Sequence, residues 1–112
     1  MLENKNLVDQ LVALYRGGKY KRLLELAGPK ANTHGAPIQL RLLCGVSKLA
    51  LGEFTEAVTI LTKLINDHPK YTDAYNNLGL AYKKRGELEL AEECFAQNIK
   101  LDPKSVLGYT NL

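Results

Sequence analysis

The sequence predicts an all-α protein built as an array of helix-turn-helix repeats, an α-solenoid. Gly18, Gly52 and Gly86 are evenly spaced along the chain, and each is followed by a charged residue and then an apolar one. Between these glycines, apolar residues recur three and four positions apart, which is typical of one buried face of an α-helix. Their 34-residue period is also typical of helical solenoids, so we expect each unit to contain a helix, a turn and a second helix.

The first unit, residues 4–37, is the most divergent. Leu7, Leu11 and Leu14 keep the helical spacing, and Gly18 follows them as the turn. We expect Gly28-Pro29 to interrupt the second helix, since glycine and proline are the strongest local breakers, and residues 32–35 to form a loop.

The second unit, residues 38–71, and the third, residues 72–105, share residue types at the same offset. The matching pairs are Gly45 with Gly79, Ala57 with Ala91, Leu61 with Phe95, Ile65 with Ile99, and Pro69 with Pro103. These pairs show that the period continues through both units.

The third unit specifies its helices most completely. Its two apolar faces are Tyr75, Leu78, Gly79 and Tyr82 on the first helix, and Leu88, Ala91, Phe95 and Ile99 on the second. Gly86 supplies a turn in which a left-handed residue can end the first helix at little cost. Asp102-Pro103 ends the second helix, because the residue before a proline is disfavoured in the helical region.

Residues 106–112 begin an incomplete fourth unit. Tyr109, Asn111 and Leu112 follow Tyr75, Asn77 and Leu78 at the interval that separates the turn glycines. We therefore expect the chain to be a fragment with an open C-terminal end, through which homo-oligomers could form, because stacked repeats cover each other's apolar faces.

Composition excludes several classes of function. At 112 residues and 46% hydrophobic content, the chain is one domain, residues 1–112, with enough apolar residues for a packed core. The net charge of +3 comes without a basic run interleaved with aromatic residues, so no nucleic acid partner is expected. No membrane span or signal peptide is expected either, and the predicted location is cytoplasmic.

Catalytic and metal-binding patterns are also missing from the sequence. Cys44 and Cys94 have no CxxC spacing, and His34 and His68 have no neighbouring ligand pattern. The serines, cysteines and histidines do not suggest a nucleophile with its base. We therefore expect no enzyme activity, no metal and no cofactor.

The third unit resembles the tetratricopeptide repeat. Seven positions carry the resemblance: Tyr75, Leu78, Gly79, Tyr82, Ala91, Phe95 and Pro103. Asn98 departs from the pattern, since a small apolar residue is usual there. The second unit departs at Arg41, Cys44 and Lys48, where larger apolar or aromatic residues are common.

The resemblance implies a right-handed superhelix and a protein-interaction scaffold. Gly79 with Ala91, and Gly45 with Ala57, would let the two helices of a unit approach closely. The first helices of the family line a concave groove in which a peptide or protein partner lies. The main candidate groove residues are Asp73, Asn76, Asn77, Leu80 and Lys84 in the third unit, Leu42, Leu43 and Val46 in the second, and Asn111 in the fourth. In the first unit, the groove positions include Val8, Asp9, Val12 and Arg16.

Two groove chemistries of the family can be compared with these positions. Chaperone-binding members hold a C-terminal carboxylate with lysine, asparagine and arginine side chains. The matching positions here are Val8, Val12, Leu43, Asp73 and Asn77, so that clamp is absent. Other members carry an asparagine ladder that grips a peptide backbone. Asn77 and Asn111 occupy ladder positions, whereas Leu43 and Asp9 do not.

These comparisons leave three hypotheses for the function. The leading one is a non-catalytic scaffold that binds a peptide or protein in its groove. The alternatives are a self-association module and the N-terminal, substrate-positioning array of a larger glycosyl- or sulfotransferase.

Overall fold

The computed structural model consists of six helices in chain order, and it describes residues 2–31, 33 and 35–104. The helices are α1 (Leu2–Arg16), α2 (Tyr20–Ala31), α3 (Ile38–Ala50), α4 (Phe54–Asp67), α5 (Thr72–Lys84) and α6 (Leu88–Leu101). No strand occurs within these described ranges, so the expected all-α class is confirmed. The predicted fourth unit, residues 106–112, lies outside the described residues.

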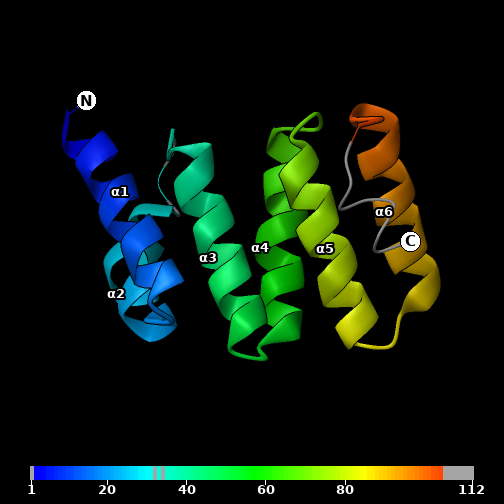
Figure 1. Ribbon diagram of the computed structural model, residues 1–112, viewed down its shortest axis with the longest axis horizontal. Coiled ribbons are helices and arrows are strands. Elements are labelled where there is room, and N and C mark those ends of the chain that lie inside the picture. Colours follow the sequence, from blue (N-terminus) through cyan, green and yellow to red (C-terminus); the bar gives the residue numbers. More distant parts are fainter. Residues whose placement is uncertain (1, 32, 34, 105–112) are drawn as a thin grey trace.

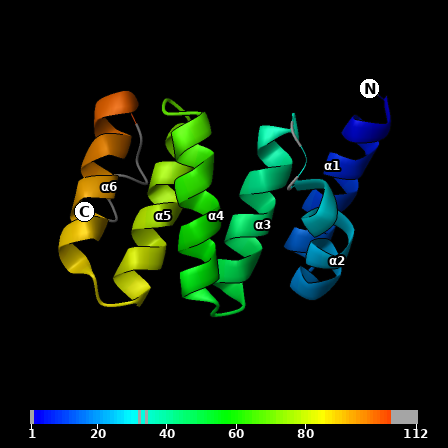
Figure 2. The same ribbon diagram turned by 180° about the vertical axis from the view of Figure 1, so that it is seen from behind.

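The helices follow one another as three antiparallel pairs stacked along the longest axis of the molecule (Figure 1). Each second helix contacts the first helix of the next pair, and α3 also contacts α1 and α5. Figure 1 views the molecule from the side of α1, α3 and α5, and Figure 2 views it from the side of α2, α4 and α6. The chain is therefore a helical-repeat solenoid in which first and second helices form separate faces.

The three turn glycines adopt the left-handed conformation that the sequence predicts. Gly18, Gly52 and Gly86 have φ angles of 72°, 80° and 82°. In each turn, the amide after the glycine donates to a carbonyl five positions earlier, as in Glu87 N to Tyr82 O at 2.9 Å. Such a bond satisfies a carbonyl that the helix end would otherwise leave without a partner.

The second helix of the first pair does not stop where the sequence predicts. α2 continues through Gly28 and Pro29 to Ala31, so the expected interruption is wrong. Proline has no amide hydrogen to donate to the carbonyl one turn earlier, but its fixed φ angle still fits the helical path. Since Pro29 lies in the last turn of α2, only one backbone hydrogen bond is lost.

Gly45 and Gly79 mark the closest approach of the two helices within a pair. A Cβ atom on Gly79 would overlap the ring of Phe95 and lie 2.7 Å from its Cδ1. A Cβ atom on Gly45 would lie 2.7 Å from Cδ2 of Leu61. The expected close approach is confirmed, but the side chains that fill the space are Phe95 and Leu61 rather than the alanines.

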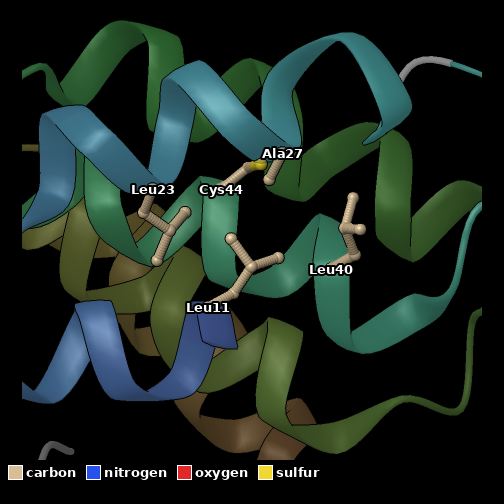
Figure 3. Packing of buried hydrophobic residues seen from close by; sticks show 5 residues of the cluster. All are labelled: Leu11, Leu23, Ala27, Leu40 and Cys44. Carbon is tan, nitrogen blue, oxygen red and sulfur yellow. The ribbon is translucent and has the colours of Figure 1, made fainter. Parts of the chain in front are cut away.

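In the first pair, the large and the small residue at these two positions are exchanged between the helices. Leu11 stands where the other pairs have glycine, and Ala27 stands where they have Leu61 or Phe95. Leu11 and Ala27 are both buried, in a cluster with Leu23, Leu40 and Cys44 (Figure 3). A large residue on the first helix therefore accompanies a small one on the second, which keeps the interior filled.

One residue of the predicted apolar face of α6 is not buried. Leu88 is 58% exposed, whereas Ala91 and Phe95 are buried and Ile99 is half-buried. Leu88 is the first residue of α6, so the predicted apolar face is buried only from the second turn of the helix onward.

The two buried cysteines should react slowly with alkylating reagents. Burial raises the pKa of the Cys44 thiol to about 11, and it raises that of Cys94 to about 11 as well. The native thiols therefore remain protonated at pH 8, where a free thiol is partly ionised. Iodoacetamide labelling followed by mass spectrometry should show slow modification in buffer and fast modification in denaturant. Equal rates in both conditions would contradict the burial.

Candidate functional site

The first helices provide the surface on which the predicted groove residues lie. α1, α3 and α5 run side by side along the molecule in both views (Figures 1 and 2). α3 contacts both of the other first helices, so their outer faces form one continuous surface. Because α3 and α5 are each also packed between two second helices, their backbone positions are fixed along their length.

The third unit places four of its five candidate residues at this surface. Asp73 and Lys84 are exposed, and Asn77 and Leu80 are half-buried. Nδ2 of Asn77 donates to the backbone carbonyl of Asp73 at 2.8 Å, one turn earlier in α5. This bond stays within α5 and holds the amide in a defined orientation.

The structure corrects the prediction for Asn76. Its side chain is only 6% exposed, so it belongs to the buried residues of α5 and not to an open surface. Asn111, the other predicted ladder residue, lies outside the described residues.

The apolar residues of the second unit are less accessible than predicted. Val46 is 8% exposed, and Leu42 and Leu43 are half-buried. Leu43 packs against the cluster that contains Leu11 and Ala27. Leu42 packs against a second cluster, formed by Leu61, Leu78 and Cys94. Leu42 and Leu43 therefore each contact a buried cluster, and only part of the surface of the three residues remains for a partner.

The first unit continues the surface with apolar and charged residues. Val8 and Val12 are half-buried, and Asp9 and Arg16 are exposed. Arg16 and Lys84 occupy equivalent positions at the C-terminal ends of their helices, where cations favour the helix dipole. The surface thus combines partly covered aliphatic residues in the first two units with polar residues in the third.

A second concave feature lies on the opposite side of α3. A cleft of about 700 Å³ separates α2 from α4, and Arg41, Cys44 and Lys48 of α3 line it together with residues of both second helices. Sequence reasoning missed this cleft. The signal was present, because Arg41 and Lys48 stand where the third unit has Tyr75 and Tyr82.

Two family models match the chain. One, described as Tetratricopeptide repeat, matches residues 72–105, and another, described as TPR repeat, matches residues 47–86. Together they cover residues 47–105, which is more than half of the chain. The chain belongs to the tetratricopeptide repeat family.

Known proteins resemble this tetratricopeptide array in sequence and in fold. The Rhomboid protease GluP of Bacillus subtilis (strain 168) is 35% identical over 79 residues, which are 70% of this chain and 16% of the protease. The chain therefore spans a small part of the length of this relative.

Solved tetratricopeptide domains share the fold over the whole array. The second TPR domain of human RPAP3, in complex with an HSP70 peptide, has a TM-score of 0.88 and 23% identity. That similarity covers 99% of this chain and 92% of the RPAP3 domain. The Sgt2 TPR domain of Aspergillus fumigatus has a TM-score of 0.90 and 19% identity, covering 100% of this chain and 76% of that domain.

The family indicates the general class of its members. Tetratricopeptide domains are generally non-catalytic scaffolds for protein interactions. Within the part of the chain that the structure describes, no group of three His, Cys, Asp or Glu side chains could hold a metal ion. None of the described helices is both long enough and apolar enough to cross a membrane.

Proposed function

We propose that the chain is a non-catalytic scaffold that binds an extended peptide segment of a protein partner across α1, α3 and α5. One observation supports this most: the shared surface of the first helices combines half-buried Val8, Val12 and Leu43 with the oriented amide of Asn77. Partly exposed aliphatic side chains rimmed by polar groups are typical of interaction surfaces. A TPR domain of the same fold is known in complex with a peptide, which supports the same use of the surface.

The proposed peptide is aliphatic at one end and bonded through its backbone at the other. Val8, Val12 and Leu43 would contact its apolar side chains. Asn77 would pair with its backbone, since a side-chain amide offers two donors and an acceptor and only one N–H contact is made to Asp73 O. Exposed Asp9, Arg16 and Lys84 border the surface, so the peptide keeps access to water along its edges.

Peptides that end in several carboxylates should not bind. Aliphatic residues occupy three of the positions at which the chaperone-binding members hold a carboxylate, and the exposed carboxylate of Asp73 occupies another. A peptide carboxylate placed there would lose its water without gaining a cation. Fluorescence anisotropy with the HSP70 peptide that RPAP3 binds should show no binding up to millimolar concentration. The RPAP3 domain serves as the positive control, and micromolar binding to this chain would contradict the prediction.

Replacing Asn77 tests the proposed surface directly. A peptide is first selected against the wild-type protein from a random displayed library. Asn77→Ala should then weaken its binding about 5- to 10-fold, because a hydrogen bond between neutral groups contributes about 1 kcal/mol. Calorimetry measures the affinity, and Asn66→Ala at an exposed position of α4 is the matched control.

Equal affinities of the Asn77→Ala and wild-type proteins for the selected peptide would remove Asn77 from the site. If Leu80→Glu also left the affinity unchanged, the surface of the first helices would not be the binding surface. A loss of affinity in the Asn66→Ala control would lead to the same conclusion.

A further inference from the structure

The cleft between α2 and α4 is a second cavity, separate from the proposed peptide surface. It is lined by residues of α2, α3 and α4, and Figure 2 shows α3 between the two second helices. Its volume of about 700 Å³ is within the range of ligand-binding pockets, roughly 300–1,000 Å³. The cleft is therefore large enough to receive a side chain together with part of its backbone.

The same place in the next pair of units is filled by tyrosines of this chain. Tyr75 and Tyr82 are the equivalents of Arg41 and Lys48. Tyr82 packs against the cluster of Leu61, Leu78 and Cys94, and the hydroxyl of Tyr75 donates to the carbonyl of Pro69 at 2.8 Å. Tyr82 thus packs against residues of α4, α5 and α6, and Tyr75 is bonded to the turn before α5.

In the cleft, the cationic side chains are drawn toward carboxylates of α4 and of the turn before it. Nη2 of Arg41 lies 2.8 Å from Oδ2 of Asp67, and the Arg41 side chain is 12% exposed. Nζ of Lys48 lies 2.7 Å from Oε2 of Glu56 and 3.1 Å from Oε2 of Glu53. These ion pairs hold both cations at the cleft. The space that tyrosine rings would occupy at these two positions stays open.

The remaining walls combine apolar residues with the polar residues Thr59 and Lys63 of α4. Leu24 and Ala31 of α2 face Ile60 of α4 across the cleft, and Cys44 of α3 lies between them. Burial raises the pKa of Cys44 to about 11, so its thiol is uncharged at neutral pH. The cavity combines these apolar side chains with two paired cations, Arg41 and Lys48, and with exposed Lys63.

This combination favours an aromatic group over an anion. A bound anion could contact Lys63, but at Arg41 and Lys48 it would compete with Asp67, Glu53 and Glu56 for cations that the fold already pairs. An uncharged ring can contact the apolar walls and place its negative face against Arg41 or Lys48 without displacing a carboxylate. We propose that the cleft between α2 and α4 binds an aromatic side chain of a partner polypeptide, in the place that Tyr75 and Tyr82 fill one unit later.

The proposal can be tested by titrating the protein with p-cresol, which reproduces the tyrosine side chain. In ¹H–¹⁵N spectra, the shifts should concentrate on cleft residues such as Gly28, Cys44 and Lys63. 4-Methylcyclohexanol, of similar shape but without a ring face, should bind several-fold more weakly. N-acetyltyrosinamide should bind at least as well as p-cresol if the cleft accepts a polypeptide.

Two kinds of variant test separately how the two cations and the open space of the cleft contribute to p-cresol binding. Arg41→Met with Lys48→Met keeps most of the side-chain length but removes the charges, and it should weaken p-cresol binding about 3- to 10-fold. Gly28→Leu should abolish binding by filling the cleft, since a Cβ on Gly28 meets no atom within 4 Å. Arg41→Tyr with Lys48→Tyr should also abolish binding, with a melting temperature at or above that of the wild type.

Five results would overturn the proposal. These are p-cresol shifts located on α1 and α5, equal binding of p-cresol and 4-methylcyclohexanol, and unchanged binding by the folded Gly28→Leu variant. The fourth is tighter binding of acetate or inorganic phosphate than of p-cresol, which would make the cleft an anion site. Weaker binding of N-acetyltyrosinamide than of p-cresol would also contradict the proposal, because it would assign the cleft to small aromatic molecules instead of a polypeptide.

Discussion

Replacing Gly79 with leucine should destabilise the array, because overpacking of a filled interior costs about 1 to 3 kcal/mol and in some cases more. A Cβ at this position already overlaps the ring of Phe95, and the rest of a leucine side chain would force α5 and α6 apart. The expected loss lies at the upper end of that range, since the improved helix propensity offsets only about 1 kcal/mol. Urea unfolding followed by circular dichroism measures the change.

A second substitution should partly restore the stability of the Gly79→Leu variant. Phe95→Ala alone should cost about 3 to 5 kcal/mol, because it leaves a cavity between α5 and α6. Combined with Gly79→Leu, it reproduces the arrangement of Leu11 and Ala27 in the first pair, where both residues are buried. The double variant should be more stable than the sum of the two single effects predicts, by about 1 to 3 kcal/mol.

Gly28→Leu is the matched control for Gly79→Leu. It makes the same replacement inside a helix at a site where a Cβ meets no atom within 4 Å, so it should not destabilise the protein. Unchanged stability of Gly79→Leu, or strictly additive effects in the double variant, would show that Gly79 and Phe95 do not meet.

Leu43→Glu should destabilise the protein by about 2 to 3 kcal/mol, through lost apolar contacts and a carboxylate that loses part of its hydration. Leu43 is half-buried and packs against the cluster of Leu11, Leu23, Ala27, Leu40 and Cys44. The substitution places the new charge beside that cluster. Thermal and urea unfolding measure the loss.

Gln39→Glu provides the control for the added charge of Leu43→Glu. Gln39 is exposed in the first turn of α3, where a carboxylate is favoured by the helix dipole, so the stability of this variant should be equal to or slightly above that of the wild type. If Leu43→Glu kept the wild-type stability and lost only the binding of the selected peptide, Leu43 would belong to the open surface and not to the core.

Much of the fold could be predicted because it depends on contacts close in the sequence. The turn glycines, the helix spacing and the prolines act over short stretches, and the repeat period copies them along the chain. The prediction failed at Pro29, where the last turn of α2 tolerates a residue that usually ends a helix earlier. It also failed at Leu88, which is exposed at the start of α6 although Ala91 and Phe95 on the same predicted face are buried.

The candidate site was harder to predict, because a first helix has several neighbours. α3 contacts α1, α2, α4 and α5, so most of its circumference is near another helix. A residue on its nominally open side can still be covered, as Val46 is, or divided between two cores, as Leu42 and Leu43 are. Asn76 is a further example: its position in the repeat assigned it to the open surface, but its side chain is buried.

The amino-acid sequence by itself determined the repeat period, the helix pairs, the turns and the membership of the family. Only the tertiary structure decided which positions on the first helices remain accessible, and that Arg41 and Lys48 border a cleft. The physical reason is that periodicity specifies the direction of a side chain from its own helix. Its burial depends on the size of residues far away in the chain, as the exchange of Gly79 and Phe95 for Leu11 and Ala27 shows.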